Sequence, residues 1–171
     1  MRGTLLKLVA VILALTLFTV VPVGAQDDKI SEPDPAAETY FIVHIQFLRI
    51  VSGLNPLYID NGMTGAARVH SERIAGWGEL IHGDHGQLFE GVPPCTIYVG
   101  ENIGTAGESD KDGMMKAFVD SQPHYENILN PRWTHLAVGL VYNDGRMWTT
   151  QRFAQSCEAP LEPQYIPRFV G

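Results

Sequence analysis

Three histidines and one glutamate stand where their side chains could carry out chemistry together. His82 and His85 lie in a glycine-rich stretch, His124 opens a short helical segment, and Glu101 follows Gly100 at the expected end of a strand. Functional sites are usually built where such elements meet loops. Two neutral imidazoles with one carboxylate can hold Zn²⁺ or another divalent cation, and without a metal they can act as general acid and base. We take His82 and His124 as the candidate metal ligands, because His82 and His85 share one Gly-containing loop and would have an unfixed geometry.

The same residues allow a structural interpretation. Glu101 could accept hydrogen bonds from backbone N–H groups and tie its strand to a loop, with His82 and His124 completing a buried polar network. The remaining histidines fall inside expected helices or at the start of a strand, and we interpret them as structural: His44, His70 and His135. A carboxylate-only cation site on an acidic loop is a further alternative: Glu108, Asp110 and Asp112.

The first 25 residues are typical of a secretory signal peptide. Arg2 and Lys7 precede an apolar run over residues 8–21, Pro22 ends it, and residues 23–25 are small, as a signal peptidase requires. The alternative is a retained membrane anchor, for which the run is short. We therefore expect cleavage after Ala25, a secreted chain with no stable membrane anchor, and a polar leader over residues 26–38.

Charge and cysteine content support this compartment. The formal net charge is −7, and removal of two basic residues with the signal leaves ten basic against nineteen acidic side chains. Such a surface repels phosphate backbones, so we expect no nucleic-acid partner. An even cysteine count in a secreted chain predicts a disulfide between Cys95 and Cys157. Closing a loop of roughly 60 residues would contribute about 4 kcal/mol in the chain-entropy description.

The helices and strands that must position these side chains can be predicted from the spacing of hydrophobic residues and from the residues that start and end such elements. Asp34 and Pro35 are typical of a helix start, and Gly53 should end that helix. Further helices are expected over 60–80, 114–119 and 123–129, strands over 96–99, 134–142 and 146–154, and loops over 81–94 and 104–113. Asn143-Asp144-Gly145 indicates a hairpin turn between the last two strands. The residues from 158 to 171 hold three prolines and should form an extended tail. This order predicts an α+β domain with helices packed on an antiparallel sheet.

At this level the chain resembles the CAP superfamily, which comprises cysteine-rich secretory, antigen 5 and pathogenesis-related proteins, and in particular its bacterial SCP-like extracellular branch. The Gly100-Glu101-Asn102 motif is weak alone, but further stretches match in the same order. They are residues 49–57, residues 67–71 with 80–82, residues 121–131, and the closing hairpin over 137–140 and 148–154.

The resemblance implies a domain over residues 39–157 with a three-layer α-β-α sandwich and a central antiparallel sheet. It also implies a cleft in which His82 and His124 match the family's two histidines and Glu101 matches its first glutamate; several relatives bind a divalent metal there. Ser121 stands where animal and plant members carry a second glutamate. Gln46 replaces the usual Asn and Tyr125 a frequent Arg.

Two functions follow as hypotheses. The first is a secreted binding module whose cleft takes a divalent metal, such as Zn²⁺, or a small-molecule, lipid or peptide ligand outside the cell. The second is a secreted metal-assisted hydrolase with Glu101 as base, or a relay through Ser121, His124 and Glu101. The chain lacks a His-Glu-x-x-His helix and a Gly-x-Ser-x-Gly elbow, which favours the binding module.

Overall fold

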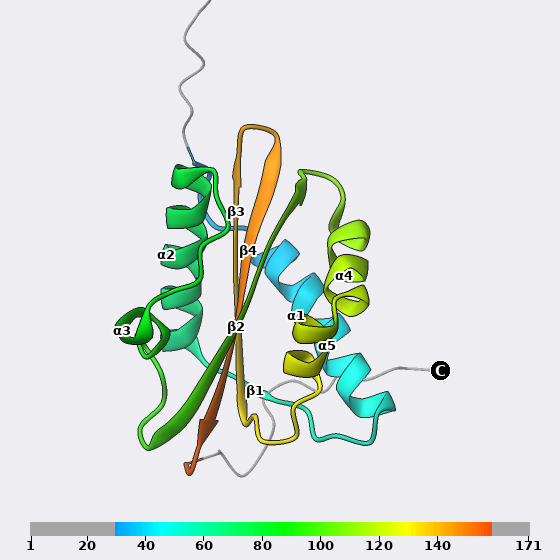
Figure 1. Ribbon diagram of the computed structural model, residues 1–171, viewed down its shortest axis with the longest axis vertical. Helices are drawn as coiled ribbons and strands as arrows, with labels where there is room; N and C mark the ends of the chain where they lie inside the picture. Colours follow the sequence, from blue (N-terminus) through cyan, green and yellow to red (C-terminus); the bar gives the residue numbers. More distant parts are fainter. Residues whose placement is uncertain (1–29, 159–171) are drawn as a thin grey trace, which may run out of the picture.

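The computed structural model describes residues 30–158, and in it helices cover both faces of a four-stranded sheet (Figure 1). Helices α2 and α3 lie on one face, and α1, α4 and α5 lie on the other. The helices are α1 (Pro35–Val51), α2 (Asn61–Trp77), α3 (His85–Leu88), α4 (Lys111–Asp120) and α5 (Gln122–Ile128). The strands are β1 (Tyr58–Ile59), β2 (Thr96–Gly107), β3 (His135–Asn143) and β4 (Arg146–Ser156). The expected α+β sandwich is confirmed.

The sheet is mixed, which corrects the expectation of a purely antiparallel one. Its strand order is β1-β3-β4-β2, and β1 pairs with β3 in parallel. Strand β1 has two residues, too few for an alternating pattern to be visible in the sequence. The β3–β4 hairpin is antiparallel as predicted, and Asp144 and Gly145 both adopt the positive φ that a two-residue hairpin turn requires.

Strand β2 is three times longer than the four residues predicted for it. It continues through Gly100 and Gly104, which we interpreted as a strand end and a loop start. Both glycines are there because helices approach the strand closely. A Cβ on Gly100 would lie 2.7 Å from Asn127 Oδ1, and one on Gly104 would lie 2.7 Å from the ring of Phe118. The polar loop predicted from residue 104 therefore begins only after Gly107.

The helix predictions hold with three differences, the first of which is that α4 begins at Lys111, inside the loop predicted over residues 104–113. Asp34 caps α1 through the backbone N–H groups of residues 36 and 37, and Asp60 caps α2. Helix α2 ends at Trp77 rather than at residue 80, because Gly78 adopts a left-handed conformation. The short helix α3 was missed inside the predicted loop over residues 81–94. Its start is stabilised by a reciprocal pair of hydrogen bonds between Asp84 and Gln87.

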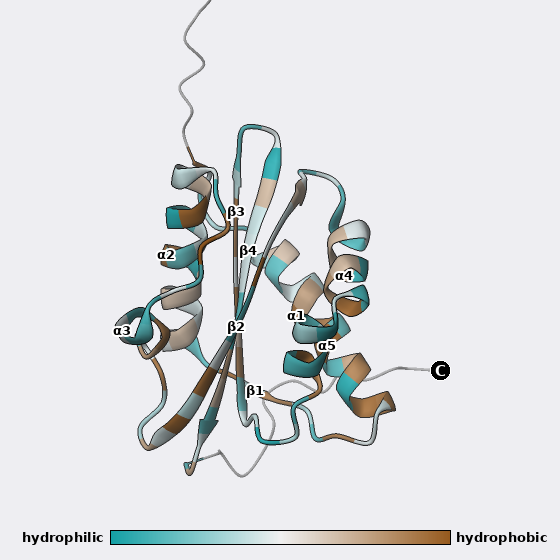
Figure 2. Cartoon of the chain, viewed as in Figure 1, coloured by the Kyte–Doolittle hydropathy of each residue, from teal (hydrophilic) through white to brown (hydrophobic). Residues whose placement is uncertain are grey.

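The hydrophobic core lies on both faces of the sheet. The larger part packs α1, α4 and α5 against β3 and β4, around Phe41, Phe118 and Phe153. On the other face α2 packs so closely that a Cβ on Gly139 would lie 2.3 Å from the backbone nitrogen of Arg68. In Figure 2, β3 is hydrophobic along much of its length, whereas the turn of the β3–β4 hairpin is hydrophilic.

The predicted disulfide is present. Cys95 and Cys157 are bonded with their Cα atoms 5.6 Å apart, at the paired ends of β2 and β4. The predicted signal peptide, the first residues of the leader and residues 159–171 of the predicted tail lie outside the described part of the chain. Within residues 30–158, none of the helices is both long enough and apolar enough to cross a bilayer.

Candidate functional site: a buried carboxylate beneath two histidines

Glu101 is buried at the centre of a polar cluster, with a side chain only 2% exposed. Its Oε1 accepts a hydrogen bond from the backbone N–H of Gly83 at 3.0 Å and lies 3.0 Å from His82 Nδ1. Its Oε2 accepts from Arg152 Nε at 3.2 Å. The carboxylate thus ties β2 to the loop after α2, as the structural interpretation predicts.

Arg152 is the partner that the sequence analysis missed. It stands directly opposite Glu101 in the β2–β4 register, and its side chain is also 2% exposed. Its Nη1 donates to the carbonyl of Gln87 at 2.7 Å, which fixes α3 against the sheet. From the sequence, this pair could be found only through the register of β2 against β4. That register could not be derived, because Gly100 and Gly104 made β2 look shorter than it is.

His70 also belongs to this cluster. We interpreted it as structural, and its imidazole is completely buried on α2. Its Nε2 lies 3.1 Å from the carbonyl oxygen of Ile81 and 3.6 Å from Glu101 Oε1. Burial lowers the pKa of His70, and the charge of Glu101 acts in the opposite direction. His70 therefore supports the loop that carries His82.

Asn102 faces the other side of the sheet, because successive strand residues point to opposite faces. Its Nδ2 donates to the backbone carbonyl of His124 at 3.2 Å and to Gln151 Oε1 at 3.0 Å. Its Oδ1 accepts from Asn127 Nδ2 at 3.0 Å. The Gly-Glu-Asn motif therefore holds both histidine-bearing segments: Glu101 binds the loop of His82, and Asn102 binds α5.

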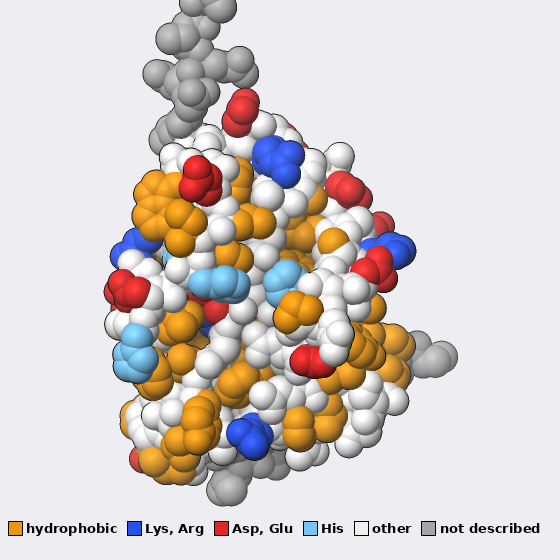
Figure 3. Space-filling model, viewed as in Figure 1, with side chains coloured by type: hydrophobic (Ala, Val, Ile, Leu, Met, Phe, Trp, Pro, Cys, Tyr) orange, Lys and Arg blue, Asp and Glu red, His pale blue; other side chains and the backbone are white. Residues whose placement is uncertain are grey.

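His82 lies at the surface above Glu101, and His124 lies near enough for the charge of His82 to act on it. The side chain of His82 is 59% exposed. Burial lowers the pKa of His124, and the nearby His82 lowers it further, so His124 favours the neutral form. Figure 3 shows two histidine side chains close together near the middle of this face. Residues 30–158 contain no group of three or more His, Cys, Asp or Glu side chains arranged to hold a metal ion.

A shallow, mainly apolar groove of about 300 Å³ adjoins His124. Ser121, which separates α4 from α5, lines it but makes no capping hydrogen bond. Within the described ranges no hydrogen bond joins Ser121 to His124. The other lining residues come from the loop after α2, from β2, and from α4 with its N-cap: Leu80, Ile103, Gly104, Thr105, Ala106, Asp110, Gly113, Met114, Ala117 and Phe118.

The remaining candidates lie elsewhere. His85 opens α3 and stacks on Phe89, with the ring centroids 4.9 Å apart. The acidic loop is already engaged: Asp110 caps α4 through Gly113, and Asp112 accepts from the hydroxyl of Tyr40. Within residues 30–158, neither His85 nor the acidic loop forms a group of metal ligands with His82 and His124.

The chain matches known proteins along most of its described length. Residues 47–153 match the CAP family, described as the cysteine-rich secretory protein family. The uncharacterized protein YkwD of Bacillus subtilis is 35% identical over 104 residues, which are 58% of this chain and 40% of YkwD. The chain thus spans less than half the length of this relative.

Solved structures share the fold. An extracellular SCP-domain protein from Bacillus anthracis gives a TM-score of 0.61 at 23% identity, over 71% of this chain and 41% of that one. An outer surface protein from Borrelia burgdorferi gives 0.62 at 14% identity, over 73% of this chain and 98% of that one. Together with the Gly-Glu-Asn motif and the histidines that it holds, these matches show that the chain belongs to the CAP family.

Proposed function

We propose that this protein is an extracellular binding module and that its ligand lies in the groove beside His124. The groove supports this proposal because it combines a mainly apolar lining with a few polar groups, the usual composition of a small-molecule site. A ligand that fits is a small molecule, lipid or peptide side chain with an apolar body and one polar end near His124 and Ser121. The extracellular location rests on the signal-like first 25 residues, the disulfide, and relatives described as extracellular or outer-surface proteins.

The surroundings of Glu101 favour binding over hydrolysis. A general base needs a free lone pair directed at the substrate. The Glu101 carboxylate instead accepts from Arg152 and Gly83 and contacts His82, and it lies beneath the surface. The catalytic assignments of Glu101 and Ser121 stay predictions. Turnover of a broad peptide library that is abolished by Ser121→Ala would favour the hydrolase.

A divalent cation such as Zn²⁺ is the second candidate ligand. It is supported by the nearness of His82, which is exposed to solvent, to His124. His82 and His124 would supply two nitrogen donors, whereas protein zinc sites use three or four ligands. Glu101 is not an available third donor while Arg152 holds it. The residues present therefore fit a weak cation site rather than a closed structural one.

The groove is tested by filling it. Ala117 lines the groove from an exposed position on α4, so Ala117→Trp occupies the space without disturbing the core. With decanoate and decanol as probes in calorimetric titration, we expect this variant to bind at least tenfold more weakly than wild type. Val69→Trp, on the exposed surface of α2, is the matched control. If Ala117→Trp and Val69→Trp bind the probes with equal affinity, the groove is not the ligand site.

The cation is tested separately with Zn²⁺ alone. We expect His82→Ala and His124→Ala each to abolish the calorimetric signal, and acidification from pH 7.5 to 5.5 to weaken it, because protons compete for imidazole nitrogen. His85→Ala serves as the control, since His85 lies on α3 outside the site. Zn²⁺ affinity that survives both substitutions would rule out the histidine pair.

A further inference from the structure

The groove beside His124 has the outer edge of strand β2 as its floor. Four consecutive residues of β2 line it, residues 103–106, and β2 is the last strand in the order β1-β3-β4-β2. The walls of the groove come from the two outer layers of the sandwich: Leu80 follows α2, whereas Met114 and Ala117 belong to α4. Because α2 and α4 cover opposite faces of the sheet, a groove that touches both must cross the edge between them (Figure 1).

The backbone along this edge has hydrogen-bonding groups without partners. In an antiparallel pair only alternate residues bond to the neighbouring strand, so two of the four residues 103–106 direct their N–H and C=O groups away from β4. Within residues 30–158, no backbone or side-chain group bonds to these outward groups. Residues 104–106 are half-buried, so a ligand in the groove can reach them. The floor of the groove therefore offers donors and acceptors at the repeat of a β-strand.

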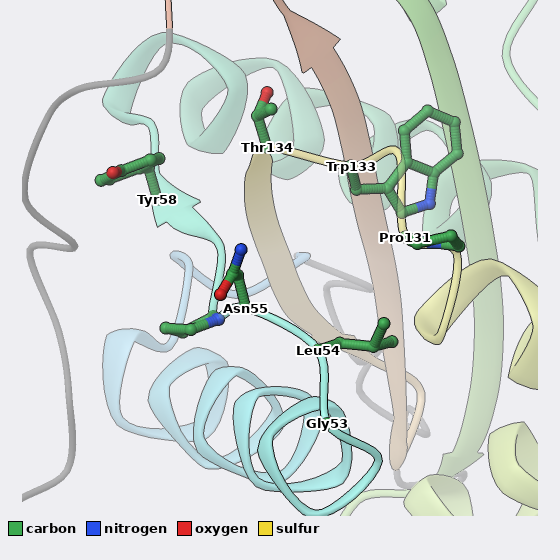
Figure 4. Close-up of a pocket in the computed structure, with 8 residues that line it drawn as sticks. Gly53, Leu54, Asn55, Tyr58, Pro131, Trp133 and Thr134 are labelled. Atoms are coloured by element: carbon green, nitrogen blue, oxygen red, sulfur yellow. The ribbon is translucent and has the colours of Figure 1, made fainter.

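The opposite edge of the sheet offers no comparable floor. It is formed by β1, which has two residues, and it adjoins a cavity of about 540 Å³ (Figure 4). Tyr58 stands on one side of this cavity and Trp133 on the other. Trp133 is 8% exposed, stacks on Phe153 and donates its indole N–H to the carbonyl of Asn127. Within the described ranges, the long open edge of the sheet is therefore that of β2.

Both walls of the groove are apolar. Met114, Ala117 and Phe118 stand on the α4 side, and Leu80 stands on the α2 side with nearly half of its surface exposed. A peptide strand projects successive side chains to opposite faces. A strand laid along β2 would therefore place one set of side chains against α4 and the alternate set against Leu80. Apolar side chains in both sets match these walls.

The two ends of the groove differ in charge. Among its lining residues in the described chain, only Asp110 carries a formal charge. Asp110 lies at the end of β2, where its backbone N–H donates to the carbonyl of Gly107. His124 lies at the other end, where its carbonyl accepts from Asn102. A cationic peptide N-terminus is attracted to the Asp110 end, and the peptide then runs from Gly107 toward Asn102, antiparallel to β2.

We infer that the groove binds an extended peptide with a free N-terminus, which pairs antiparallel with residues 103–106 and adds a strand to the sheet. This inference rests on the proposed function and narrows its ligand to a peptide that is held by its backbone. Addition of a strand to an exposed sheet edge is a recurring mode of peptide recognition, in which main-chain hydrogen bonds give affinity and pockets for alternate side chains give specificity.

The probe is the peptide Ala-Val-Ala-Val-Ala with an amidated C-terminus, titrated calorimetrically into the chain from residue 26. Two N-methylated forms separate strand pairing from apolar contact: one is methylated at both valines, the other at the last two alanines. The N–H groups of a strand alternate between its neighbour and solvent. We therefore expect one form to bind at least tenfold more weakly than the parent peptide and the other to bind like it. Equal affinities of the two forms would overturn the inference.

Amide hydrogen exchange, followed by NMR, reads the edge directly. Saturating peptide should slow exchange at two alternate N–H groups among residues 103–106, whereas decanoate should not. Unchanged exchange with bound peptide would place the peptide away from the edge. Binding of decanoate without binding of the peptide would also overturn the inference but would leave the proposed function standing. Absence of binding by both probes would overturn both.

The direction of the peptide is tested at Asp110. Asn caps a helix as well as Asp does, so Asp110→Asn should keep α4 intact. At low salt it should weaken the parent peptide about two- to fivefold and leave the N-acetylated peptide unaffected. Asp60→Asn, at the cap of α2 outside the groove, is the matched control and should change neither affinity. If Asp110→Asn behaves like this control, the N-terminus does not lie at Asp110 and the antiparallel assignment is wrong.

Discussion

Replacing Glu101 by Gln tests whether the carboxylate is chiefly a structural counter-charge. The change keeps the shape of the side chain but removes its charge, and it leaves the guanidinium of Arg152 buried with no anionic partner in the cluster. Both side chains are 2% exposed, so water cannot compensate the loss. Removing one partner of a buried ion pair costs about 3–5 kcal/mol. For a domain of this size, that corresponds to a melting temperature lowered on the order of 10 °C.

The assay is urea unfolding followed by tryptophan fluorescence without reductant, so that the disulfide stays intact. Glu126→Gln is the matched control, because within residues 30–158 the side chain of this exposed carboxylate bonds only to Gln122. Its loss should change the free energy of unfolding by less than about 0.5 kcal/mol. If Glu101→Gln unfolds like the control, the buried pair contributes little and our reasoning is wrong. Loss of ligand binding without loss of stability would instead give Glu101 a direct part in the site.

Three further results are expected. Gly100→Ala should destabilise the fold by roughly 1–3 kcal/mol, because the new Cβ would meet Asn127 and Trp133, whereas Gly107→Ala, in open space, should be neutral in thermal unfolding. Reducing the disulfide should cost about 4 kcal/mol on the chain-entropy estimate, checked by urea unfolding with and without reductant; a difference below 1 kcal/mol would contradict it. Burial lowers the pKa of His135, so its contribution to stability is present above about pH 6.5 and is lost as the pH falls. His135→Asn should flatten the acid side of the stability profile between pH 6.5 and 5, and an unchanged slope would refute this.

Much of the fold could be predicted because its signals are local. Helix starts are marked by residues next to them: Asp34 with Pro35 before α1, and Asp60 before α2. The hairpin turn is likewise specified by its own two residues, Asp144 and Gly145. The predictions that fail concern positions where contacts between residues far apart in the sequence determine the structure. Gly100 resembles a strand end until one knows that α5 packs on it.

The site follows the same division. His82, Glu101 and His124 could be selected by residue type and by resemblance, and the contact of His82 with Glu101 is confirmed. Arg152 could not be selected, because a cation on a strand indicates nothing until the register places it opposite Glu101. His70 was judged by its place within a helix, whereas its role depends on the loop that returns over it.

The disulfide also determines how the sheet opens. Strand β2 is an edge strand, and an edge normally frays from its ends, which exposes amides to exchange with solvent. The bond between Cys95 and Cys157 closes one end of the β2–β4 ladder covalently, a few residues from Glu101. Fraying can therefore start only at the Gly107 end. Among the β2 amides that bond to β4, exchange should slow from the Gly107 end toward Val99, and in a reducing medium this gradient should disappear.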